Sequence, residues 1–64
     1  MRIDRIKLIS ELARKDVTQK KLSELSGVSR NTINAICGGK SCTDVVGHKI
    51  AVALQVPIES LLER

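Results

Sequence analysis

The sequence contains no phenylalanine, tryptophan or tyrosine, and only one proline and two cysteines among its 64 residues. Proteins that bind single-stranded nucleic acid usually stack the bases on aromatic side chains. The absence of aromatic residues therefore argues against that class. If the partner is a nucleic acid, this composition favours a duplex.

The two cysteines, Cys37 and Cys42, are too few for a disulfide framework. We expect reduced thiols in a cytoplasmic protein, because the N-terminal residues are charged where a secretory leader would be apolar. Together with His48 the cysteines give the spacing C-x4-C-x5-H, which matches no established zinc pattern. The sequence therefore predicts no metal site and no cofactor.

Long apolar runs are also missing, since none approaches the ~18 residues that a membrane span needs. The length predicts one domain over residues 1–64 with a small core. Eleven basic and seven acidic residues give a net charge of +4. Such a charge is compatible with a polyanionic partner, but it also suits an ordinary solvated surface.

Apolar residues recur at steps of three and four along most of the chain, which predicts an all-α fold of five short helices and no sheet. The first helix is expected over residues 2–15, ending at Asp16, a residue type that tolerates a left-handed turn. Its apolar stripe comprises Ile6, Ile9 and Ala13, with Leu8 and Leu12 beside them.

Two short helices should follow, joined by a tight turn at Gly27. Thr18 is the expected N-cap of the second helix and Ser29 that of the third. The expected apolar positions are Leu22 and Leu25 in the second helix, and Ile33, Ile36 and Cys37 in the third. Gly38 and Gly39 should end the third helix.

The fourth helix should begin after Thr43 and stop at Val56–Pro57, because a residue before proline avoids the helical region. Its apolar face comprises Val46, Ile50, Ala53 and Leu54. Gly47 inside this helix predicts close packing, with His48 exposed beside it. A last short helix is expected from Ile58 to Leu62.

Acidic residues normally follow a helix N-cap, and the second and third helices break this rule. Thr18 is followed by Gln19, Lys20 and Lys21, and Ser29 by Arg30, Asn31 and Thr32. Such helix ends can bind phosphate. Either violation alone could be a chance feature of a solvated surface, but the two flank one tight turn, which favours a function.

The segment from Thr18 to Lys40 resembles the helix-turn-helix signature of the Cro/C1-type (XRE) regulators. The matching residues are Thr18, Gln19, Leu22, Ser23, Ser26, Gly27, Val28, Ser29, Thr32, Ile33, Ile36, Gly39 and Lys40. The likeness continues through Lys49-Ile50-Ala51, Ala53-Leu54, Val56 and Leu61-Leu62.

This resemblance implies a compact five-helix lambda-repressor-like domain whose third helix enters the major groove. Arg30 and Asn31 would face base edges, and Arg–guanine and Asn–adenine pairs are well suited to that role. Asn34 and Ala35 are the remaining groove-facing positions. The expected phosphate contacts are Gln19, Lys20, Ser29, Thr32 and Lys40. The alternative interpretation of the asparagines is that they are ordinary residues of the helix surface and contact no base. For Lys20 and Lys21 the alternative is that their charges only keep the protein soluble.

The sequence departs from the family pattern at three places. Many members carry a buried Arg–Glu pair where this chain has Leu12 and Cys37, and replacing both partners by apolar groups is often neutral or stabilising. Cys37 is therefore expected in the core. Gly38 stands where a phosphate-bonding asparagine is common, so that contact is lost.

Family members usually act as dimers, and the apolar residues Ile58, Leu62 and Val52 are the expected interface. The alternative is that they only cover the core. The sequence thus predicts a sequence-specific regulator, of the repressor kind, on a palindromic operator. A protein-interaction module, such as an antitoxin or coregulator subunit, is the competing reading. No enzyme is expected, since the serines have only His48 as a possible base.

Overall fold

The computed structural model describes residues 1–63, which form four α-helices and one 3₁₀ turn. The elements are α1 (Arg5–Arg14), α2 (Gln19–Ser26), α3 (Arg30–Cys37), α4 (Asp44–Leu54) and the turn η1 (Ile58–Ser60). The expected all-α fold is confirmed, but a single 3₁₀ turn replaces the fifth helix. No helix within residues 1–63 is long and apolar enough to cross a membrane.

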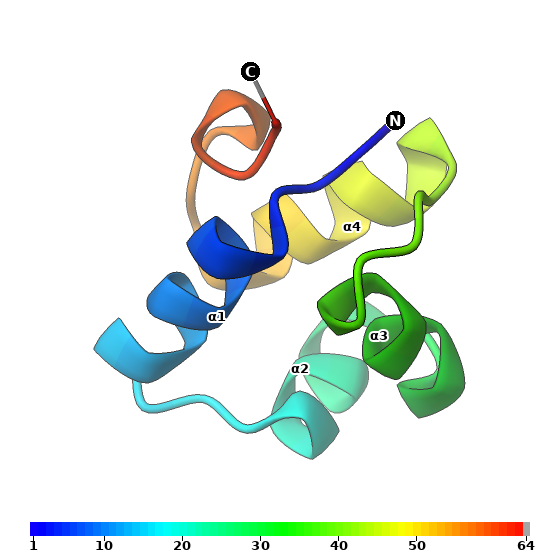
Figure 1. Cartoon of the computed structure of the whole chain (residues 1–64). Helices are drawn as coiled ribbons and strands as arrows, with labels where there is room; N and C mark the ends of the chain where they lie inside the picture. Colours follow the sequence, from blue (N-terminus) through cyan, green and yellow to red (C-terminus); the bar gives the residue numbers. More distant parts are fainter. Residues whose placement is uncertain (64) are drawn as a thin grey trace.

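α2 and α3 lie together at one end of the molecule, and α4 packs behind them (Figure 1). The N-terminal segment and η1 occupy the opposite end. Ile3 and Leu62 form an isolated antiparallel bridge there, which is the extent of β pairing within residues 1–63. The main-chain nitrogen of Asp4 also donates to the Leu61 carbonyl at 2.7 Å. The chain ends thus close the domain.

The helix starts are set by local side-chain caps. Thr18, Ser29 and Thr43 each accept a hydrogen bond from the main chain three residues ahead, as predicted. α1 begins at Arg5 and not at residue 2, because the Asp4 carboxylate accepts from the nitrogens of the next turn. The first three residues are therefore outside the helix.

The turns between helices need left-handed backbone at a few positions. Asp16 has φ 56° and Gly27 has φ 75°, both where the sequence predicted a left-handed turn. α4 ends at Leu54, with Gln55 at φ 58°. The stop therefore comes before the expected Val56–Pro57, because Gln55 itself adopts the left-handed conformation.

The core is built from aliphatic residues of every element except η1. Its fully buried side chains are Ile3, Leu8, Leu22, Ile33, Ile36, Ile50, Leu54 and Leu61. Gly47 is also buried, and a Cβ there would collide with Sδ of Met1. The predicted close packing at Gly47 is confirmed.

Two predicted buried faces are wrong. On α1 the whole predicted stripe is exposed, with Ile6 at 60%, Ile9 at 44% and Ala13 exposed as well, while Leu8 and Leu12 face the core. The pairing of the residues before α1 with the C-terminal segment orients α1 so that Leu8 points inward. On α2 the side chain of Leu25 is 51% exposed, because the helix turns Leu22 to the core with Ser23 and Ser26 half-buried beside it, and this rotation leaves Leu25 on the outer edge.

Candidate nucleic-acid interface

The α2–α3 pair is held by side-chain bonds across its turn. The Ser23 hydroxyl donates to the Val28 carbonyl at 2.7 Å, and the Val28 nitrogen donates to Ser26 Oγ at 3.2 Å. Val28 is buried, and Gly27 supplies the positive φ before it. These contacts fix α3 relative to α2, as a helix-turn-helix requires.

The first turn of α2 exposes amide groups beside cations. Thr18 Oγ1 accepts from the Lys21 nitrogen at 3.0 Å, which satisfies only one of the amide groups at this end. Gln19 is half-buried and Lys20 is exposed. The α2 start can therefore accommodate an anion.

The first turn of α3 has the same construction with an additional hydroxyl. Ser29 Oγ accepts from the Thr32 nitrogen at 3.2 Å and donates to Thr32 Oγ1 at 2.9 Å. Because Ser29 uses its hydrogen in this way, the hydroxyl hydrogen of Thr32 remains able to donate outward. A phosphate oxygen is a suitable acceptor for it.

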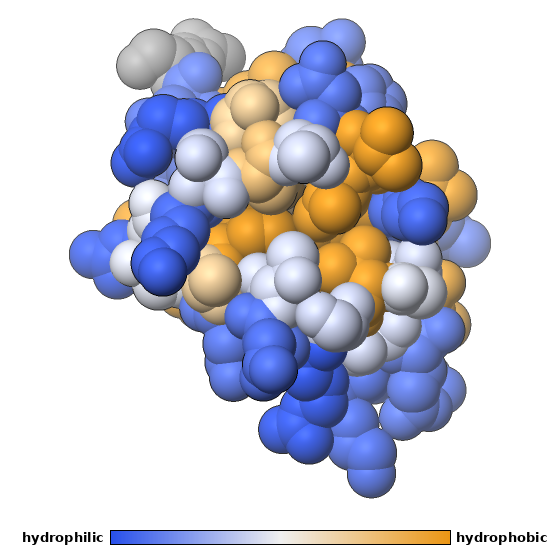
Figure 2. Space-filling model, turned by 90° about the vertical axis from the view of Figure 1, so that its right-hand side faces the viewer, coloured by the Kyte–Doolittle hydropathy of each residue, from blue (hydrophilic) through white to orange (hydrophobic). Residues whose placement is uncertain are grey.

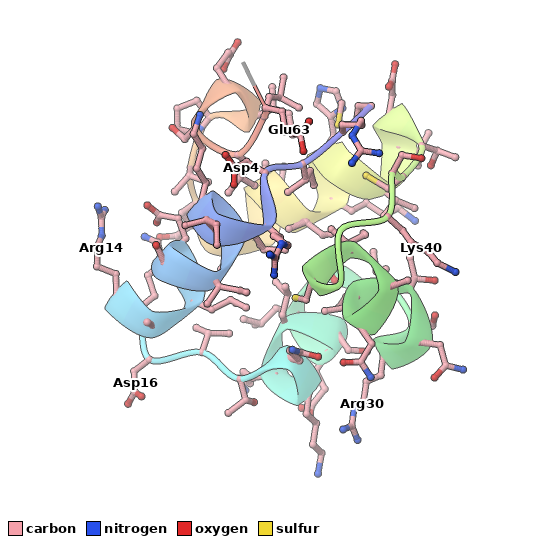
Figure 3. The ribbon with its side chains drawn as sticks, in the orientation of Figure 1. Asp4, Arg14, Asp16, Arg30, Lys40 and Glu63 are labelled. Atoms are coloured by element: carbon pink, nitrogen blue, oxygen red, sulfur yellow. The ribbon has the colours of Figure 1, made fainter. Side chains whose placement is uncertain are left out.

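The candidate base-reading residues share one side of α3. Arg30, Asn31 and Asn34 are exposed and Ala35 is half-buried. Ile33 and Ile36, on the opposite side, are fully buried. Figure 3 shows Arg30 extending away from the body of the molecule at the outer end of α3. The structure therefore presents one amide-rich, cationic side of α3 to solvent.

Lys40 lies just beyond the other end of α3 and is exposed. Its main-chain nitrogen donates to the Ala35 carbonyl at 3.0 Å, which closes the turn after the helix. Gly39, at φ 103°, makes that turn possible. Lys40 is thus placed on a defined loop at the end of α3 (Figure 3).

The place of the usual Arg–Glu pair is apolar in this chain. Leu12 is 7% exposed, Cys37 packs half-buried against the core, and no polar or charged residue in residues 1–63 is fully buried. Burial raises the pKa of the Cys37 thiol, which favours its protonated form. No group of three or more metal-ligating side chains occurs in the described part of the chain.

The residues expected at a dimer interface differ in their surroundings. Ile58 packs partly buried against the core, and Leu62 is half-buried at its bridge with Ile3. Val52 is 75% exposed. It lines a groove of about 520 Å³ between α2 and α4 together with Leu25 and Val45. Figure 2 shows hydrophobic surface from the centre to the upper right of one side of the molecule, with hydrophilic residues around it.

The sequence reasoning missed two arginines near Lys40. Arg2 Nη2 donates to the Gly39 carbonyl at 3.2 Å, across 37 positions of sequence. A Cβ built on Gly39 would lie 3.9 Å from Cδ of Arg5. No local pattern could have indicated these contacts, because they depend on how the N-terminal segment crosses the α3–α4 loop.

The chain is similar in fold to a segment of larger enzymes. A point mutant of hydroxyethylphosphonate dioxygenase has a TM-score of 0.89 at 23% identity, and native PhpD with cadmium has 0.86 at 22%. The likeness covers 100% of this chain and 14% of each of those chains. At this identity it shows the fold alone. No curated protein matches the sequence.

The family comparison covers most of the chain. A model described as the Cro/C1-type HTH DNA-binding domain matches residues 7–64, which include the whole α2–α3 unit, Lys40 and α4. The helices, caps and turn described above are those of a helix-turn-helix. The chain therefore belongs to the family of Cro/C1-type helix-turn-helix DNA-binding domains.

Proposed function

We propose that this protein is a sequence-specific regulator that binds duplex DNA as a homodimer and represses transcription from a palindromic operator. α3 enters the major groove, where Arg30 and Asn31 contact bases and Asn34 and Ala35 face the groove one turn later. The backbone is held by Gln19, Lys20, Ser29, Thr32 and Lys40. The chain has no catalytic role in this proposal.

One observation carries the proposal: two adjacent helices begin with hydroxyl caps and cationic or amide first turns, without an acidic residue in either. Their amide groups and dipoles favour anions, and the exposed side chains add positive charge and base-reading groups. A purely structural helix end would gain stability from an acidic residue there, as α4 does with Asp44.

Selection from a random duplex pool tests the proposal. We expect enrichment of palindromes whose half-site centres are ~34 Å apart, and no enrichment from a single-stranded pool of the same length. A duplex pool that stays unenriched would contradict sequence-specific binding.

The homodimer is proposed to use Ile58, Leu62 and Val52. Exposure of Val52 makes it the most informative position, since its substitution leaves the core intact. Sedimentation at tens of micromolar should show a dimer that Val52→Ser weakens. Ile9→Ser, which removes an exposed isoleucine on α1, is the matched control. Only monomer, with and without selected DNA, would contradict the dimer.

A protein-interaction module is the second candidate, and the apolar groove between α2 and α4 favours it. Leu25 is 51% and Val45 is 64% exposed there, so a partner could bury both. An adjacent gene for a toxin-like protein that forms a complex through this groove would support this function. A divergent promoter containing the selected palindrome would support the repressor.

A further inference from the structure

The N-terminal segment lies against the loop that carries Lys40. The Met1 carbonyl accepts from the Cys42 nitrogen at 3.0 Å. Arg2 Nη2 donates to the Gly39 carbonyl at 3.2 Å. The loop between α3 and α4 is thus bonded to the N-terminal segment on both sides of Lys40, so its position depends on residues far away in sequence.

Arg5 begins α1 at this junction and is exposed. A Cβ on Gly39 would be in van der Waals contact with Cδ of Arg5, at 3.9 Å. The arginine stem thus lies close to the turn at Gly39. The Arg5 side chain therefore passes beside the residue that immediately precedes Lys40.

The acidic side chains around this junction already have partners. Asp4 accepts from the nitrogens of Ile6 and Lys7 at 2.9 and 3.3 Å. Glu63 Oε1 lies 3.2 Å from Nε of Arg2. Within residues 1–63 the Arg5 side chain forms no hydrogen bond or ion pair. Its guanidinium donors can therefore bind an external anion.

We propose that Arg5 contacts a DNA backbone phosphate next to the one held by Lys40, which extends the phosphate-binding surface from the α3–α4 loop onto α1. The inference rests on the proposed function. A guanidinium can bind phosphate in bidentate fashion, so Arg5 provides a contact where Gly38 and Gly39 have no side chain. The contact orients the domain and reads no base.

The test compares Arg5→Gln with Arg14→Gln on the duplex selected by the wild type, with dissociation constants measured over a range of salt. Both variants lose one positive charge from α1, but Arg14 lies at the far end of the helix from Lys40 (Figure 3). Arg5→Gln should lower the log–log salt slope by about one, and Arg14→Gln should leave it unchanged. Arg5→Lys should restore most of the slope.

Equal salt slopes for Arg5→Gln and wild type would overturn the Arg5 contact. An equal reduction of the salt slope by Arg14→Gln would also overturn it, because it would show that only the net charge of the domain matters. Thermal unfolding should change little in either variant, because Arg5 is exposed and Arg14 loses an ion pair with Glu11 in which the arginine is exposed. If Lys40→Ala lowers the slope and Arg5→Gln does not, the Arg5 proposal alone fails. If the wild type binds no duplex, the proposed function fails with it.

Discussion

α3 and α4 begin with the same hydrogen bond and continue with opposite charge. Ser29 Oγ accepts from the Thr32 nitrogen at 3.2 Å, and Thr43 Oγ1 accepts from the Val46 nitrogen at 3.2 Å. The first residue of α3 is then Arg30, whereas the first residue of α4 is Asp44. Both helices thus use a hydroxyl cap to begin, whereas the charge of the residue after the cap differs between them.

The charge at a helix start has a known energetic scale. An acidic residue there stabilises by ~0.3–1 kcal/mol and a cation has the opposite effect. Both α2 and α3 lack an acidic residue in the first turn, although such a loss is a noticeable fraction of a small domain's stability. The corresponding gain is affinity for a polyanion, which the α4 start with its acidic first turn does not offer.

Charge reversal at the α3 start should have the largest effect. Arg30→Glu removes the proposed bidentate base contact, which would be worth ~1–3 kcal/mol, and adds repulsion of the DNA, so affinity should fall by about 100-fold or more. The free energy of unfolding should stay the same or rise by up to ~1 kcal/mol, because the new carboxylate suits the helix dipole. Binding titrations and urea unfolding measure the two effects. Wild-type affinity in Arg30→Glu would show that the α3 start does not contact DNA.

Removal of the loop cation should have a smaller and sequence-independent effect. Lys40→Ala should weaken binding to all duplexes alike and lower the salt slope by about one, because the contact proposed for Lys40 is to phosphate only. Titration of selected and random duplexes over a range of salt checks this. Lys15→Ala removes a charge at the end of α1 that is not among the proposed phosphate contacts, so it should leave the slope unchanged. A changed base preference in Lys40→Ala would contradict a purely phosphate role.

Removal of either cap should lower stability by similar amounts. Ser29→Ala and Thr43→Ala each lose a side-chain bond to the main chain, and each should reduce the free energy of unfolding by ~0.5–2 kcal/mol. Ser29→Ala should also weaken DNA binding, whereas Thr43→Ala should not once folding is complete. Equal effects of both variants on DNA affinity would remove the distinction between the two helix starts.

Neutralising the α4 start should give the smallest change. Asp44→Asn removes a favourable interaction with the helix dipole, so the free energy of unfolding should fall by ~0.3–1 kcal/mol. DNA affinity should not change. Urea unfolding at low and high salt measures the loss, which salt should reduce. A stability gain would mean that the acidic first turn of α4 has no structural role.

Local features of the fold could be predicted because they depend on neighbouring residues. The caps at Thr18, Ser29 and Thr43 and the left-handed residues Asp16 and Gly27 are all set within about four positions of sequence. The exposed side of α3 followed from the same local pattern. Most of the candidate interface, namely the starts of α2 and α3 and the exposed side of α3, could therefore be predicted.

Features that depend on distant parts of the chain could not be predicted. α1 carries two overlapping apolar stripes, and pairing of the N-terminal segment with residues 61–63 decides that Leu8 faces inward and Ile6 outward. The hydrogen bond of Arg2 to Gly39 and the proximity of Arg5 to the same turn join segments that no periodicity relates. The overall fold could therefore be predicted from the sequence. The rotation of α1 about its axis and the extent of the cationic surface near Gly39 could not.

In the proposed function the α3 start reads the DNA sequence, and the sharpest test is to repeat the duplex selection with Arg30→Ala. We expect the wild-type palindrome with preference lost at one base pair of each half-site, at a cost of ~1–3 kcal/mol per contact. Selection of the unchanged wild-type site by Arg30→Ala would show that Arg30 does not read a base.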